Sequence, residues 1–336
     1  MKKILIDVEI HQAGLERLKE LQDVEVECVA PALEVRVLPT KLIADAHLLF
    51  CTFPPSNLAE MKHLEVIQIG SVGYEQLSGL GLPQKNIRAC NARGAFDPTI
   101  AEWNMAMMIN LLRDLRGMIR NQGLGIWDRD ARFQSELRGL TVGIWGYGGI
   151  GRATARLAKA FGMKIHVLTR NGVRPRENTY LVPGTGDPQG EIPDQIFSYD
   201  EKDEFLASLD FLILAVPQTP QTEGIVGQTE LQMLKSSAFV LNPARGPLIQ
   251  EAALLQALRE NWIAGAALDT HYHYPMPADH PLWRFPNVIM TPHISGSGES
   301  PHYLERVWNI FITNVDRHLN GEPLLNELEP SQLETV

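Results

Sequence analysis

Three residues of this sequence have side chains suited to acid–base chemistry on an anion, and each follows an apolar run of strand type. They are Arg245, Asp269 and His293. An arginine can bind a carboxylate through its planar fork of N–H groups, and a histidine can supply a proton near neutral pH. Each alone is more often a surface charge or a structural residue, so the positions of the strands decide whether they act together.

A glycine-rich turn identifies the sheet on which these residues would lie. Gly146-Tyr-Gly-Gly-Ile-Gly151 stands between the apolar run Leu140–Trp145 and an alanine-rich run, and it fits G-x-G-x-x-G. Gly146 allows a tight turn, Gly148 lets the backbone approach a pyrophosphate, and Gly151 lets the helix pack close to the sheet. A strand before the motif and a helix after it are the context it requires. We therefore predict dinucleotide binding rather than a purely structural turn.

The end of the second strand of this unit indicates which dinucleotide binds. An acidic residue there usually binds the ribose hydroxyls of NAD, but Thr169 and Arg170 occupy the place. No Asp or Glu occurs between Arg152 and Arg176. A hydroxyl and a guanidinium suit a 2′-phosphate, which favours NADP over NAD. The alternative is that these arginines, with Arg174, form a solvated surface loop.

Composition sets wider bounds on the function. The chain has 336 residues, 44 % hydrophobic and 21 % charged, with a formal net charge of −10, which argues against nucleic-acid or acidic-membrane partners. It has no apolar run long enough to span a membrane, and its first residues are not expected to form a signal peptide. The three cysteines lack metal-ligand or redox-pair spacing. We expect buried thiols, no metal site and a cytoplasmic location.

The order of apolar runs predicts two α/β domains. Strands alternate with helices in residues 1–98, the dinucleotide unit covers 99–296, and residues 297–336 return to the first domain, which is therefore discontinuous. A long helix from Pro98 to about Arg120 is apolar on more than one face, so we expect it to pack between domains or between the subunits of a homodimer. The segment 171–199 is long for one connection and is expected to be functional or mobile.

In an open parallel sheet, ligands bind outside the carboxyl ends of the strands. Arg245, Asp269 and His293 follow the fourth, fifth and sixth predicted strands of the dinucleotide unit. Although far apart in sequence, they should therefore converge on one crevice.

These motifs together resemble the D-isomer-specific 2-hydroxyacid dehydrogenase family over essentially the full chain. The matching pieces are Ser71-Val-Gly-Tyr-Glu75, Thr99-Ile-Ala-Glu102, Leu140–Gly151, Pro217-Gln-Thr-Pro-Gln-Thr222, Asn242-Pro-Ala-Arg-Gly-Pro-Leu-Ile249, Ala266-Ala-Leu-Asp269, Asp279-His-Pro-Leu282 and Thr291-Pro-His-Ile294. Within the family, the pattern is most similar to glyoxylate/hydroxypyruvate reductases. The resemblance implies an α/β fold of two domains: a Rossmann doubly wound parallel sheet and a smaller flavodoxin-like domain.

The resemblance also implies roles in transferring hydride from a nicotinamide to a small 2-oxo acid. Arg245 would bind the substrate carboxylate and polarise the ketone oxygen, with Ser71, Val72 and Gly73 holding the carboxylate's other side. His293 would be the acid. Asp269 would orient the nicotinamide carboxamide, unless it is a solvated residue at a strand end. Cofactor contacts, to NADP by preference or to NAD, are implied for Thr99, Gly146, Tyr147, Gly148, Gly149, Ile150, Gly151, Thr169, Arg170, Val216, Pro217, Thr222, Pro243, Ala244, Asp269 and Ser295.

One position departs from the family pattern. The glutamate that pairs with the histidine is expected five residues after Asp269, where this chain has Tyr274. A phenol carries no charge that would stabilise the histidine cation; the alternative is that the carboxylate of Asp279 takes that role. The sequence thus leaves three readings: a reductase of glyoxylate-like acids, a cofactor-binding sensor or corepressor-like protein with little turnover, and a reductase of larger or aromatic 2-oxo acids. In the last, the rings at 271–274 would line the pocket rather than pack the cleft.

Overall fold

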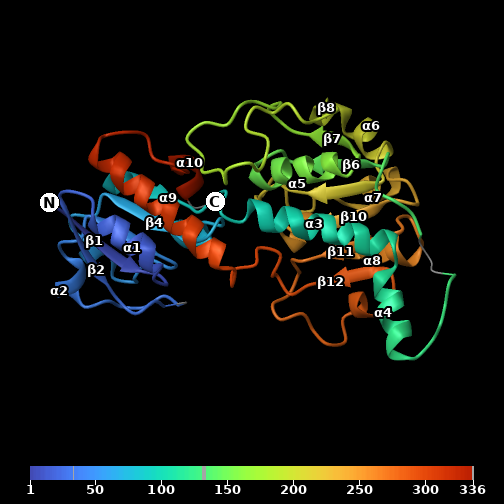
Figure 1. Ribbon diagram of the computed structural model, residues 1–336, viewed down its shortest axis with the longest axis horizontal. Helices are drawn as coiled ribbons and strands as arrows, with labels where there is room; N and C mark the ends of the chain where they lie inside the picture. The colour runs from blue at the N-terminus through green and yellow to red at the C-terminus, as the bar shows by residue number, and fades with distance from the viewer. Residues whose placement is uncertain (33, 131–133, 335–336) are drawn as a thin grey trace. The chain divides into compact units, whose positions relative to one another are not determined.

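The computed structural model describes residues 1–32, 34–130 and 134–334, and the chain forms two compact units (Figure 1). Unit 1 comprises Met1–Phe96, Glu177–Val182 and Gly298–Val336, and unit 2 comprises Asp97–Arg176 and Pro183–Ser297. The chain first passes from unit 1 to unit 2 between residues 96 and 97, and it finally returns to unit 1 between residues 297 and 298. Both points lie within two residues of the expected boundaries. Residues 177–182, expected in the dinucleotide domain, belong instead to unit 1 because they hydrogen-bond to its last loop.

Unit 1 is built on a parallel sheet of order β2-β1-β3-β4-β5. Its elements are β1 (Lys2–Asp7), α1 (Gln12–Lys19), β2 (Val24–Cys28), α2 (Thr40–Ile43), β3 (Leu48–Cys51), β4 (Val66–Ile69), β5 (Arg88–Cys90), α9 (Pro301–Leu319) and α10 (Pro330–Leu333). Successive strand residues point to opposite faces. Ile4 and Phe50 therefore pack under α9, while Leu5 and Leu49 join the core on the other face.

Unit 2 has a seven-stranded parallel sheet of order β12-β11-β10-β9-β6-β7-β8. Its elements are α3 (Asp97–Leu112), α4 (Leu115–Gly123), β6 (Thr141–Trp145), α5 (Gly149–Ala160), β7 (Lys164–Leu168), β8 (Gln195–Phe197), α6 (Lys202–Ala207), β9 (Phe211–Leu214), α7 (Gln228–Met233), β10 (Phe239–Asn242), α8 (Glu251–Arg259), β11 (Gly265–Leu268) and β12 (Val288–Met290). Helices α3 and α5 lie side by side on one face, and α6, α7 and α8 cover the other (Figure 1). The three-residue β8 was not expected.

The long helix expected to reach Arg120 is two helices. α3 ends at Leu112, and Asp114 adopts φ +45, a left-handed conformation that no helix continues through. Its carboxylate accepts a hydrogen bond from the N–H of Gly117 and so caps the new helix α4. The prediction of one continuous helix was therefore wrong, because apolar periodicity does not register a capping aspartate.

The remaining expectations concern cysteines, membranes and metals. Cys51 and Cys90 are buried, but Cys28 is exposed at the end of an edge strand, so the expectation that all three thiols are buried was wrong. Among the described residues, no helix combines the length and apolar character needed to cross a bilayer. In the same residues, no group of three or more His, Cys, Asp or Glu side chains is arranged to hold a metal ion.

Candidate active site

Arg245, Asp269 and His293 lie at the carboxyl ends of three neighbouring strands of unit 2, as the sequence predicted. They follow β10, β11 and β12, which are adjacent in the sheet. The sheet therefore brings together residues that are almost fifty positions apart.

Asp269 is fully buried, and its carboxylate shapes the turn that carries His293. Its oxygens accept hydrogen bonds from the Thr291 hydroxyl at 2.6 Å, from the N–H of Ile294 at 2.9 Å, and from the N–H and hydroxyl of Ser295 at 3.0 and 2.5 Å. Its carbonyl accepts the N–H of His293 at 2.7 Å. These bonds hold His293 at φ +58, a conformation that non-glycine residues rarely adopt. An additional contact of Asp269 with a nicotinamide carboxamide stays a prediction.

Tyr274 occupies the position beside the imidazole of His293. Its hydroxyl oxygen lies 3.1 Å from His293 Nδ1, and the centres of the two rings are 5.7 Å apart. The same oxygen accepts the backbone N–H of His271 at 3.3 Å. A phenol can donate its proton to a neutral Nδ1 or accept one from Nδ1–H of the cation. The hydrogen bond is thus available in both protonation states of His293, but without a charge to favour the cation.

The surroundings of His293 lower its pKa below the ordinary value. Partial burial of the ring is the main cause; the negative charge of Asp269 opposes it, and Arg245 and His271 add to it. Among the described residues, Asp269 is the anion that opposes this effect, and its carboxylate already accepts hydrogen bonds from Thr291, Ile294 and Ser295. The neutral imidazole is therefore the favoured form near pH 7.

His271 braces this site in a way that sequence reasoning did not identify. It is 7 % exposed, and its Nε2 donates to the carbonyl of Thr291 at 2.7 Å, while its backbone N–H binds Tyr274. Trp103 Nε1 reaches the Thr291 hydroxyl at 3.2 Å. The sequence indicated only a cluster of rings at 271–274. The spacing of aromatic residues does not distinguish a ring that hydrogen-bonds to the backbone of the site from one that lines a pocket.

Arg245 begins a tight turn at the end of β10. Asn242 is almost fully buried, and its side-chain oxygen accepts a hydrogen bond from the N–H of Ala244 at 3.1 Å. Its side-chain amide donates to the carbonyl of Arg245 at 2.8 Å. Arg245 Nη1 donates to the carbonyl of Ala244 at 2.8 Å. The guanidinium is thereby oriented by its own loop, which is what a carboxylate-binding arginine requires.

In unit 1, the predicted anion-binding residues Ser71, Val72 and Gly73 follow β4, with their carbonyls turned inward. The Val72 carbonyl accepts from Asn91 Nδ2 at 2.7 Å, and the Gly73 carbonyl accepts from the Ser71 hydroxyl at 2.7 Å. Gln76 donates to Ser71 Oγ at 2.9 Å. Within the described part of the chain, the N–H groups of Val72 and Gly73 donate to no acceptor. Two such donors suit a carboxylate.

The glycine turn fits a dinucleotide pyrophosphate. Gly146 has φ +99, and a Cβ there would collide with Ala215, while a Cβ at Gly151 would meet the carbonyl of Gly146. At Gly148, by contrast, a Cβ would meet no atom within 4 Å, so protein packing does not explain this glycine. Gly148 also caps α5 without a side-chain hydrogen bond. The first N–H groups of the helix and the space beside them are thus suited to phosphate oxygens.

The end of β7 presents a cation on an aromatic platform. The guanidinium of Arg170 lies 5.8 Å from the ring centre of Tyr199, which follows β8. The buried Trp145 donates its indole N–H to the Tyr199 hydroxyl at 3.1 Å, which fixes the platform. Thr169 is half-buried beside them. Arg176, by contrast, lies 3.9 Å from Asp97 and is partly neutralised by it.

The other predicted cofactor residues line the same edge, but several hydroxyls already have protein partners. Thr222 binds the carbonyl of Pro217 at 2.7 Å, and Thr99 binds the carbonyl of Gly296 at 2.9 Å. These threonines shape loops around the site, as Ser295 does through Asp269. Val216, Pro243, Ala244, Tyr147, Gly149 and Ile150 lie on the loops or helix start that follow β9, β10 and β6. Their contact with a cofactor stays a prediction.

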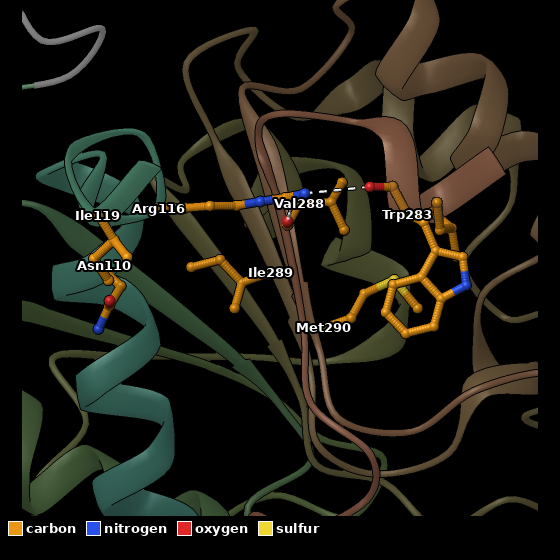
Figure 2. Close-up of a pocket in the computed structure, with 8 residues that line it drawn as sticks. Asn110, Arg116, Ile119, Trp283, Val288, Ile289 and Met290 are labelled. Atoms are coloured by element: carbon orange, nitrogen blue, oxygen red, sulfur yellow. Dashed lines mark hydrogen bonds between the residues drawn. The ribbon is translucent and has the colours of Figure 1, made fainter. Parts of the chain in front are cut away.

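A separate hollow of about 340 Å³ lies between the α3–α4 region and β12 (Figure 2). Arg116 extends across it and donates to the carbonyls of Trp283, Phe285 and Val288. Its other lining is mainly apolar, including Ile119. The guanidinium ties α4 to the sheet edge, and the hollow contains none of the acid–base residues described above.

Comparison with known proteins gives a consistent result. The family model described as D-isomer specific 2-hydroxyacid dehydrogenase, NAD binding domain, matches residues 105–295. The chain is 30 % identical to a glyoxylate reductase of Thermofilum pendens, over 95 % of this chain and 92 % of that one. It is 33 % identical over 96 % of its length to a D-3-phosphoglycerate dehydrogenase of Methanocaldococcus jannaschii, of which it spans 58 %.

Solved structures agree over the full length. A D-isomer specific 2-hydroxyacid dehydrogenase family protein from Aeromonas salmonicida has a TM-score of 0.78 at 27 % identity, covering 98 % of this chain and 99 % of that one. An NADPH-dependent glyoxylate/hydroxypyruvate reductase from Sinorhizobium meliloti has a TM-score of 0.72 at 26 % identity, covering 98 % of each chain.

Proposed function

The chain belongs to the D-isomer-specific 2-hydroxyacid dehydrogenase family, and from this premise we propose that it reduces a small, unphosphorylated 2-oxo acid of the glyoxylate or hydroxypyruvate type with NADPH. The observation that carries the proposal is the oriented Arg245 on the same strand edge as His293, whose Nδ1 is hydrogen-bonded to Tyr274. Bound NADPH supplies the hydride.

The protein's own groups would perform the remaining steps. Arg245 binds the carboxylate and stabilises the negative charge that develops on the ketone oxygen. His293 Nε2 gives that oxygen a proton, and Tyr274 accepts the Nδ1–H of the cation. In unit 1, the N–H groups of Val72 and Gly73 offer a second anion-binding position. The replacement of the family's glutamate by Tyr274 suggested a sensor with little turnover. Because Tyr274 still hydrogen-bonds the imidazole, His293 can nevertheless act as the proton donor.

An unphosphorylated substrate is favoured by the loop that follows β3 in unit 1, although Arg93, which follows β5, is a cation at another strand end of that unit. A phosphoryl group needs cations, yet β3 is followed by Thr52-Phe-Pro-Pro55, which offers none. Arg36 in the same unit is engaged by Asp7 at 2.7 Å and by the carbonyl of Ala30. NADPH rather than NADH is favoured by the Arg170 guanidinium, which lies against the Tyr199 ring. The similarity to the NADPH-dependent reductase of Sinorhizobium meliloti supports the same choice.

The test is a steady-state panel of 2-oxo acids with NADPH and NADH. We expect the highest kcat/KM for glyoxylate or hydroxypyruvate with NADPH, and weaker turnover of phenylpyruvate and of 3-phosphohydroxypyruvate. Arg245→Lys, which keeps the charge but removes the planar fork, should lower kcat/KM by about a hundredfold and leave the NADPH dissociation constant unchanged. Absence of turnover, or preference for the phosphorylated acid, would contradict the proposal.

A further inference from the structure

The connection between β7 and β8 is tied to both units of the molecule. It runs from Thr169 to Asp194 without a helix or strand and appears in Figure 1 as the yellow-green loop that leaves β7 and returns to β8. Its residues 177–182 belong to unit 1, and the residues on either side belong to unit 2. The chain therefore passes between the units at this segment as well as at residues 96–97 and 297–298.

In unit 2, the segment is fastened to the glycine turn by a buried carboxylate. Asp187 is 3 % exposed and accepts the hydroxyl of Tyr147 at 2.7 Å. It also accepts the N–H groups of Gly190, Glu191 and Ile192 at 3.0 to 3.1 Å. Burial alone would raise the pKa of Asp187, but these donors lower it below the ordinary value, so the carboxylate stays ionised. Tyr147 is the residue between the first two glycines of the turn.

A buried arginine makes the same connection from the helix side. Arg152 is 5 % exposed, and its guanidinium lies 4.9 Å from the Tyr147 ring centre. It donates to the carbonyl of Tyr147 at 3.1 Å, to that of Arg174 at 2.6 Å and to that of Asp187. A single cation thus links the glycine turn with both limbs of the segment.

In unit 1, the segment is held by the loop that follows α9. The carbonyl of Asn178 accepts the N–H of Asn326 at 2.9 Å, and the N–H of Tyr180 donates to the Asn326 side chain at 3.3 Å. Gly94 has φ +96, and a Cβ there would collide with the carbonyl of Tyr180. The Tyr180 ring packs against the core of unit 1.

Only six residues separate Tyr180 from Asp187, and two of them, Gly184 and Gly186, have positive φ. Both ends of this short piece are therefore fixed. We propose that Asp187 and Arg152 are positioning residues for the phosphate-binding turn, acting through Tyr147, and that the segment couples cofactor binding to the order of unit 1 around Asn326. The coupling rests on the proposed binding of NADPH at the glycine turn. Because coupling free energies are reciprocal, a cofactor that stabilises the glycine turn should also stabilise the segment, and a more stable segment should strengthen cofactor binding.

The test is hydrogen–deuterium exchange of the full chain with and without saturating NADPH. In the parent protein, we expect NADPH to slow exchange at the glycine turn, at residues 177–182 and at residues 322–328. Asp187→Asn and Tyr147→Phe should keep the protection of the turn, reduce that of the other two stretches, which Arg152 still links to the turn through backbone carbonyls, and weaken NADPH binding about threefold to tenfold. Asp194→Asn is the matched control, because Asp194 lies in the same connection but binds Lys159 and the N–H of Ile165.

The outcomes distinguish a failure of the proposed coupling from a failure of the proposed NADPH-dependent function. If NADPH protects the turn but never residues 322–328, or protects them equally in Tyr147→Phe, the coupling is wrong while the cofactor site stands. If Asp194→Asn reduces protection as Asp187→Asn does, the effect reflects general loosening and the positioning role is wrong. If NADPH neither binds nor protects the turn, the proposed function fails and the coupling fails with it. Tyr147→Phe, which loses only a hydroxyl, serves if Asp187→Asn does not fold.

Discussion

At the scale of single residues, Tyr274 determines how the proton donor is tuned. Its hydroxyl lies 3.1 Å from Nδ1 of His293, where a carboxylate would favour the cation. Partial burial and the positive charge of Arg245 lower the pKa of this histidine below about 6.5. Reduction needs the cation in the free enzyme, so kcat/KM for reduction should fall as the pH rises through this lowered pKa. Oxidation needs the neutral ring and should gain over the same range.

Tyr274→Glu should move the alkaline limb of the reduction profile upward. A carboxylate next to Nδ1 raises the pKa of His293, by about one pH unit if it is ionised, which corresponds to about 1.4 kcal/mol. The measurement is the pH dependence of kcat/KM for reduction in the parent and the variant.

His273→Glu is the matched control, because it adds the same charge one residue earlier on an exposed side chain. It should shift the profile much less. Superimposable profiles for Tyr274→Glu and the parent, with both proteins folded and cofactor-bound, would show that residue 274 does not tune the acid.

At the scale of elements, the ends of β7 and β8 form the cofactor-selecting edge. The backbone N–H of Thr169 binds the carbonyl of Phe197 at 3.1 Å, so the two strand ends stay in register. Tyr199 then supports Arg170 from the neighbouring strand. A cation held on an aromatic face loses little freedom when it binds a phosphate, which favours a 2′-phosphorylated cofactor.

Thr169→Asp combined with Arg170→Ala should reverse the preference from NADPH to NADH, because it replaces an attractive charge with a repulsive one. Tyr199→Leu should weaken NADPH about threefold and leave NADH unchanged, since only the platform is lost. Lys164→Ala, at the other end of β7, removes the same charge as a control. Dissociation constants by titration test all three variants; equal affinities for the two cofactors in the parent protein would refute the assignment.

At the scale of the whole molecule, α4 and the residues after it carry apolar side chains that are largely exposed within the described part of the chain. Ile119, Leu124, Ile126 and Trp127 are 66, 66, 52 and 91 % exposed. Several exposed apolar side chains close together in a chain are typical of protein–protein interfaces. We therefore assign the predicted homodimer contact to this stretch, since the preceding helix α3 already buries much of its apolar surface against unit 2.

The dimer prediction is tested by light scattering at micromolar concentration. The parent protein should have about twice the chain mass of 37.5 kDa. Ile126→Ser with Trp127→Ser should give the monomer mass, whereas Phe161→Ser, which changes another exposed ring of unit 2, should not. A monomeric parent protein would exclude the assignment.

The sequence alone determined the fold class and the strand ends that carry the chemistry. Continuous apolar runs bounded by Gly, Pro and polar residues read as buried parallel strands, and the carboxyl ends of such strands share one edge by geometry. Arg245, Asp269 and His293 therefore needed no coordinates to be grouped. The same logic predicted the glycine turn: Gly146 has a positive φ, Gly151 packs against the carbonyl of Gly146, and Gly148 leaves space beside the start of the helix.

Only the tertiary structure decided what depends on contacts between distant segments. It used the carboxylate of Asp269 to form the histidine turn and set Tyr199 against Arg170, whereas the place of Tyr274 beside His293 was already implied by the resemblance. It also assigned residues 177–182 to unit 1. Local patterns encode which residues are buried and which backbone angles they adopt, whereas a side chain's partner is selected by packing across the whole chain, so spacing along the sequence cannot specify it.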